Sequence, residues 1–181
     1  MNMVGVHGNV HIILYDANGA IKKEVTKKNM VTGKFLYCMA GYTGDGYGSI
    51  RPFALSFSSN TAIPTDTKNI PGSETEGLTP MMNTCFYGHG TMGTPSVNTN
   101  PAEGYPYFSV SWTVAAGLGT GTIKTLITGG FQWNASYWAR KSIGAFVVLS
   151  SDEWIIKEGS DSMAISWIFY LSGVFKTKNW F

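Results

Sequence analysis

The stretch VHIILYDANGAIKKEVT at residues 10–26 decides how the chain begins to fold. A β-rich run precedes Asp16–Gly19, and a run that alternates apolar with polar side chains follows it. The Asn-Gly pair within Asp16–Gly19 supplies the positive φ angles that a tight hairpin turn requires. The stretch therefore predicts a β-hairpin whose second strand places Ile21 and Val25 together on one face.

Further strand signals cover much of the remaining chain. Alternating or β-rich segments lie at 52–58, 108–114, 122–128, 131–138, 143–150, 154–157 and 163–171, and Gly129-Gly130 is expected to break the run between two of them. The segments SVSWTV at 109–114 and AISWIF at 164–169 resemble each other, so we expect two similar central strands that each place a Trp in or near the core. The helices that an α/β fold needs between strands are missing. The predicted fold is all-β: an antiparallel, jelly-roll-like β-sandwich.

One short helix is expected among these strands, near residues 30–40. Val31, Phe35 and Met39 recur at a spacing of four, which is typical of one helix face. Gly41 is a suitable residue to end such a helix. We therefore predict a helix of about two or three turns after the hairpin.

A long insertion rich in Pro, Gly and Thr, at residues 59–106, separates two of the strands. All seven prolines lie between Pro52 and Pro106. A loop of this length inside a compact domain is unusual unless it has a function. We therefore expect a single domain over residues 1–181, with an insertion at 59–106 that orders itself against another protein surface.

The charge content of the chain is low. Charged residues make up 13% and aromatic residues 14%, and the net charge is +2. The charged share is about half that of an average soluble domain, so we expect neighbouring subunits to cover part of the surface. The local cluster KKEVTKK at residues 22–28 is interpreted as a solvated edge strand protected by lysines. The small basic excess does not favour a nucleic-acid partner.

Cysteine usage and hydropathy indicate the cellular compartment in which the protein is expected to act. Cys38 and Cys85 are too few for a disulfide framework, and they form no Cys-x-x-Cys pair. The beginning of the chain lacks the basic start and uninterrupted apolar core of a signal peptide. No run reaches the roughly 18 apolar residues of a membrane span. We expect a protein that is made and used without secretion and without a membrane partner.

One histidine motif suggests a serine hydrolase. The residues GHGT around His89 resemble the histidine box of subtilisin-like proteases, with Asp16 before it and Ser162 after it in that family's chain order. The neighbours of Asp16 and Ser162 do not match the family, and an all-β layout does not provide its triad geometry. A hydrolase is therefore a weak hypothesis for this chain.

Metal, phosphate and glycosidase sites are disfavoured as well. On a strand, His7 and His11 lie about 13 Å apart, too far for ligands that must approach zinc to about 2 Å. The loop TGDGYG at 43–48 lacks the lysine of a phosphate-binding loop and the spaced carboxylates of a calcium loop. Four acidic residues lie at predicted turns, where solvation is their expected role: Asp152, Glu153, Glu158 and Asp161. We expect no enzyme activity and no cofactor.

Aromatic side chains are the richest candidates for contact sites. Trp112, Trp154 and Trp167 are expected in the core. The candidate interface or ligand-contact residues are Tyr105, Tyr107, Trp133, Tyr137 and Trp138. Such rings either pack against protein or stack on sugars, and the sequence leaves both alternatives open.

The two ends of the chain carry a further signal in the order of their features. The hairpin is followed by KNMVT at 28–32, which leads into the predicted helix. Near the other end, WIIK at 154–157 and a polar turn precede MAISWIF at 163–169. Both arrangements resemble those of small structural proteins of tailed bacteriophages. The likeness covers the two ends and leaves 59–106 unmatched.

This resemblance implies a non-enzymatic component of a bacteriophage virion, in the tail, neck or fibre region, assembled in the host cytoplasm. It implies a symmetric homo-oligomer, such as a ring or trimer, that contacts other virion proteins, and it transfers no catalytic residue. The alternative hypothesis is a carbohydrate- or receptor-binding β-sandwich module at a host-contacting tip. A host surface glycan would be its ligand.

Overall fold

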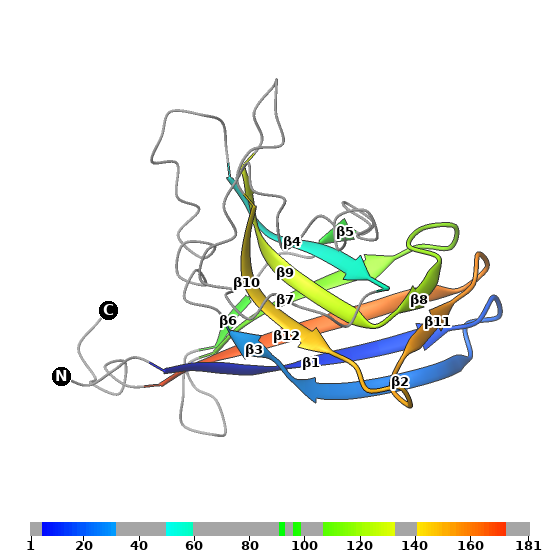
Figure 1. Cartoon of the computed structure of the whole chain (residues 1–181), viewed down its shortest axis with the longest axis horizontal. Coiled ribbons are helices and arrows are strands. Elements are labelled where there is room, and N and C mark those ends of the chain that lie inside the picture. The colour runs from blue at the N-terminus through cyan, green and yellow to red at the C-terminus, as the bar shows by residue number, and fades with distance from the viewer. Residues whose placement is uncertain are drawn as a thin grey trace.

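The computed structural model describes residues 5–31, 50–59, 91–92, 96–98, 107–132 and 141–172. Within these ranges every regular element is a β-strand, and the paired strands are antiparallel. The strands form a six-stranded, a four-stranded and a two-stranded sheet (Figure 1). The prediction of an all-β antiparallel fold is confirmed for this part of the chain. No helix long and apolar enough to cross a bilayer occurs in it.

The six-stranded sheet contains both the first and the last strand. Its order is β2-β1-β12-β7-β5, and β6 also pairs with β7. Its strands are β1 (Gly5–Tyr15), β2 (Ile21–Lys28), β5 (Thr91–Met92), β6 (Ser96–Asn98), β7 (Tyr107–Val114) and β12 (Ser162–Ser172). β12 pairs with β1 along its whole length and with most of β7. The three strands β1, β12 and β7 therefore form the middle of this sheet.

The remaining strands form the two smaller sheets. The four-stranded sheet has the order β3-β10-β9-β4, and β11 pairs with β8 in the two-stranded sheet. These strands are β3 (Met30–Val31), β4 (Ile50–Ser58), β8 (Gly121–Ile123), β9 (Thr125–Gln132), β10 (Lys141–Val148) and β11 (Ile155–Lys157). The prediction of one strand at 122–128 is wrong, because the chain leaves β8 at Lys124 before β9 begins.

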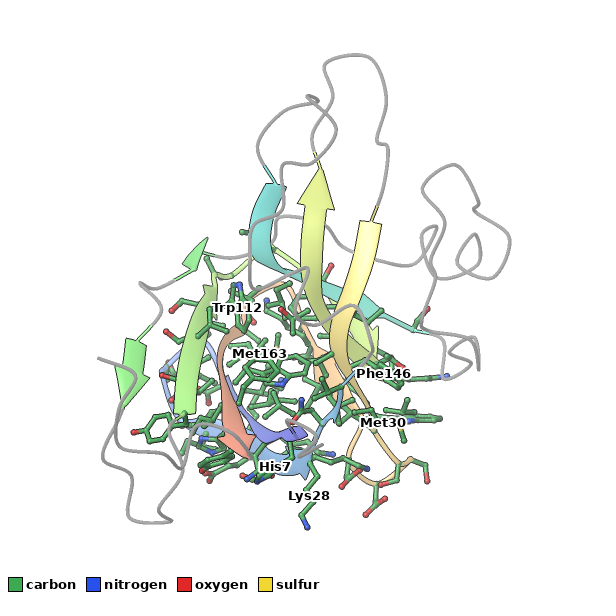
Figure 2. All side chains as sticks on the ribbon, turned by 90° about the vertical axis from the view of Figure 1, so that its left-hand side faces the viewer. His7, Lys28, Met30, Trp112, Phe146 and Met163 are labelled. Carbon is green, nitrogen blue, oxygen red and sulfur yellow. The ribbon has the colours of Figure 1, made fainter. Side chains whose placement is uncertain are left out.

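Side chains from all three sheets share one hydrophobic core. Along β1, β7 and β12, buried side chains alternate with more exposed ones, as expected for a sheet with one buried face. Trp112 and Trp167 are buried there, with ring centroids 6.3 Å apart in an edge-to-face arrangement. Figure 2 shows Trp112 and Met163 on the side of this sheet that faces the four-stranded sheet. The expectation that the two similar segments place a Trp in the core is confirmed, and Trp154 packs half-buried against it.

The first hairpin forms as predicted, with one difference. Asp16 Oδ1 accepts hydrogen bonds from the amides of Asn18 (2.8 Å) and Ala20 (2.9 Å), and Gly19 has a φ of 81°. A register shift pairs Tyr15 with Ile21, so the strand carries one extra residue at this point. The shift turns Ile21 away from the face of Val25 and leaves it 58% exposed. The prediction that Ile21 and Val25 share a face is wrong for this reason.

Two other expectations concern residues that the structure describes only in part. Of the helix predicted near 30–40, Met30 and Val31 are described, and they pair with β10 as a strand, so a helix does not begin before residue 32. Of the insertion 59–106, the short strands β5 and β6 pair with β7. The remaining residues of both segments lie outside the described ranges.

The expected break at Gly129-Gly130 does not occur. β9 continues through both glycines and pairs with β4 on one side and β10 on the other. Register shifts between Ile143 and Ala145 and between Arg51 and Ala54 lie opposite these glycines. Glycine inside a strand often marks a bulge or the close approach of another backbone, so the pair marks a place of irregular pairing rather than a strand end.

Candidate functional site

The face of β1, β12 and β7 that points away from the core is the candidate functional surface. We call it the outer face. Register and alternation place its residues in four rows across the three strands, and Tyr15 with Ser162 continues the face on β1 and β12 beyond the fourth row. The rows are His7, Tyr170 and Tyr107; Asn9, Ile168 and Ser109; His11, Ser166 and Ser111; and Ile13, Ala164 and Thr113. All twelve residues are exposed or half-buried.

The outer face is unusual in its lack of charge. None of the residues in β1, β12 or β7 is Asp, Glu, Lys or Arg. Burial accounts for the lack of charge among the core-facing residues of these strands, because charged groups are rarely buried. It does not account for the lack of charge among the outward-facing residues, since a one-sided antiparallel sheet normally presents polar and charged residues to water. Depletion of charge at an exposed patch is a property of protein interfaces.

The first row gathers three rings from three strands and is called the aromatic row. His7 stacks on Tyr170, with ring centroids 5.3 Å apart and planes 20° from parallel. Tyr107 meets Tyr170 edge-on, with centroids 5.8 Å apart. Figure 2 shows His7 on the side of the sheet opposite Trp112. Cross-strand aromatic pairs favour such stacked and edge-on arrangements and stabilise the sheet modestly.

Tyr107 was predicted as a contact residue, and the structure places it in the aromatic row. Tyr105, Trp133, Tyr137 and Trp138, the other four predicted contact residues, lie outside the described residues. His7 and Tyr170 were missed by sequence reasoning. The pairing of the first strand with the last brings these two distant rings into one row. No local sequence pattern reveals that pairing.

The middle of the outer face has small polar side chains. Ser166 and Ser111 are directly opposite each other, and Ser109 precedes them in the neighbouring row. His11 Nε2 and Glu24 Oε1 of the edge strand β2 lie 2.7 Å apart. The centre of the outer face therefore has small, uncharged side chains. The aromatic row lies at one end of it, and the pair of His11 and Glu24 lies along the β2 side.

Charged residues concentrate instead where β2 meets the segment 150–161. Lys22 Nζ lies 2.9 Å from Asp161 Oδ2 and 3.0 Å from Glu158 Oε2. Lys27 pairs with Glu153. Lys23 donates to the carbonyl oxygen of Asp152 at 2.6 Å. We call this region the ion-pair seam, because it joins the edge of the six-stranded sheet to the chain that links β10 with β12.

Two buried groups complete the ion-pair seam. The Asp161 side chain is 1% exposed, and its carboxylate also accepts a hydrogen bond from the Glu158 amide at 2.8 Å. These bonds, with that from Lys22 the strongest, lower the pKa of Asp161. Lys157 is 1% exposed and donates to the carbonyl oxygens of Asp161 (2.6 Å) and Ala115 (3.2 Å). Burial lowers the pKa of Lys157.

The seam corrects two interpretations of the sequence. β2 is an edge strand as expected, but its lysines are not all solvated, because Lys22, Lys23 and Lys27 have partners in the segment 150–161. The acidic turn residues were expected to be solvated too, whereas Glu153 and Asp161 accept hydrogen bonds from these lysines. The signal that sequence reasoning missed was the placement of Lys23 and Lys27 on the core-facing side of β2, together with Val25.

The described residues give no support to the metal site or the catalytic triad that the sequence analysis considered. They contain no group of three or more His, Cys, Asp or Glu side chains placed to hold a metal ion. The Asp16 carboxylate is engaged by the turn amides. His89 lies outside the described residues, so the triad hypothesis stays untested.

Comparison with protein-family models, with curated proteins and with solved structures finds no match for this chain.

Proposed function

We propose that this chain is a non-catalytic structural subunit of a bacteriophage particle, of the tail, neck or fibre region, and that it assembles through its outer face. The observation that carries the proposal is the complete absence of charged residues from β1, β12 and β7, although half of their side chains point away from the core. A face of this composition is suited to contact protein rather than water.

The proposed architecture is a β-sandwich of the jelly-roll-like kind. The shared core supports it, because buried side chains of the six-stranded sheet and of β4, β9 and β10 belong to one cluster. Sheets that pack in this way about 10 Å apart present two opposite outer surfaces. One of these surfaces is the outer face.

The proposed setting is the virion, with other virion proteins and further copies of this chain as partners in a ring or trimer. Its support is the resemblance of residues 28–32 and 154–169 to tailed-phage structural proteins and the low charge of the whole chain. Among the described residues, five charged side chains form ion pairs at the seam and none lies on the three strands of the outer face. No nucleic acid or membrane is part of the proposal.

Quantitative mass spectrometry of density-purified particles tests this function. Particles from a culture that expresses the chain should contain it at a fixed ratio to the major particle protein through successive purification steps. Loss of the chain during purification, with a constant amount of the other particle proteins, would contradict the proposal.

A carbohydrate- or receptor-binding module is the second candidate function, and the aromatic row favours it. Tyrosine and histidine rings next to small hydroxyl side chains can contact a sugar through stacking and hydrogen bonds. A glycan array probed with the full chain should then give hits that Tyr107→Ala abolishes. Absence of hits, or hits that Tyr107→Ala leaves unchanged, would reject this candidate.

A further inference from the structure

We draw no further inference here: the strongest candidate, the outward side of the two-stranded sheet of β8 and β11, where Ile156 is 61% exposed, carries nothing because nothing in the structure shows what covers it.

Discussion

The outer face and the ion-pair seam lie on the same sheet and have opposite chemistry. The three middle strands contain no charged residue, whereas β2 at the edge and the segment 150–161 supply five ion-pairing side chains. The seam satisfies its charges within the chain, partly in buried positions. The outer face has rings and small hydroxyls that no charged side chain of its own strands surrounds.

This difference separates what holds the fold together from what is available to a partner. The edge strand β2 directs Lys23 and Lys27 toward the core side, and inward-pointing lysines discourage the addition of another strand at an edge. Association through the edge is thereby disfavoured, and association through the face is not. The predictions that follow break one region or the other, beginning with the largest expected effect.

Gly8 tests the close approach of β1 to β12, on which the rows of the outer face depend. A Cβ atom at Gly8 would lie 1.9 Å from the carbonyl oxygen of Ile168 and 2.8 Å from Asn29 Oδ1. Gly8→Ala must therefore push β1 away from β12, and we expect it to lower the free energy of unfolding by about 3 kcal/mol. Denaturant unfolding measures this loss.

Gly159→Ala is the matched control for Gly8. A Cβ atom there would meet nothing within 4 Å. The control should change the free energy of unfolding by less than about 0.5 kcal/mol. Equal stability of the two variants would show that β1 and β12 do not pack as described, and the rows of the outer face would lose their basis.

Lys157 tests the ion-pair seam. Lys157→Met keeps most of the buried volume but leaves the carbonyl oxygens of Asp161 and Ala115 without this donor. We expect a loss of about 2 kcal/mol in the free energy of unfolding, since buried acceptors without partners are costly. Lys28→Met, at an exposed lysine of β2, should cost less than about 0.5 kcal/mol. A stabilised Lys157→Met protein would mean that the cost of burying this charge exceeds the value of its hydrogen bonds.

Acid should weaken the seam by protonating Glu153. The hydrogen bonds from Lys27 and from the Ser150 hydroxyl and amide lower the pKa of Glu153 from 4.5 to about 2. A lowered carboxylate pKa contributes stability that is complete above the ordinary value and is lost as the pH falls from about 4.5 toward 2. For this half-exposed pair we expect a loss of about 1 kcal/mol or less.

Thermal unfolding as a function of pH measures this contribution. The melting temperature of the unchanged protein should fall over that interval, and Glu153→Gln should lower it at neutral pH and reduce its dependence on acid. An identical acid response in the two proteins would show that Glu153 does not contribute to the stability of the seam.

Much of the fold could be predicted from the sequence because its signals are local. The turn at Asp16–Gly19 and the alternation at 109–114 and 164–169 depend on neighbouring residues, so they indicate strands and a hairpin without knowledge of the partners. Ile21 shows the limit. Its face depends on a register shift opposite Tyr15, which the strand pattern alone does not contain.

The candidate surface could be predicted only in part, because it depends on strand order. Tyr107 was identified as a contact residue from its type, but its partners His7 and Tyr170 come from strands at the two ends of the chain. The charges of the seam were visible as a lysine cluster and an acidic cluster. Their pairing became apparent only when the structure placed the segment 150–161 against β2.

The dependence of self-association on salt tests the central claim most directly, namely that the uncharged face rather than a charged surface joins the subunits. Sedimentation equilibrium of the unchanged chain at low and high salt provides the measurement. Contacts between uncharged groups are little affected by ionic screening, so the self-associated form should persist at high salt with a dissociation constant changed less than about threefold. An oligomer that dissociates steeply as salt increases, or a chain that stays monomeric at every salt concentration, would contradict the account.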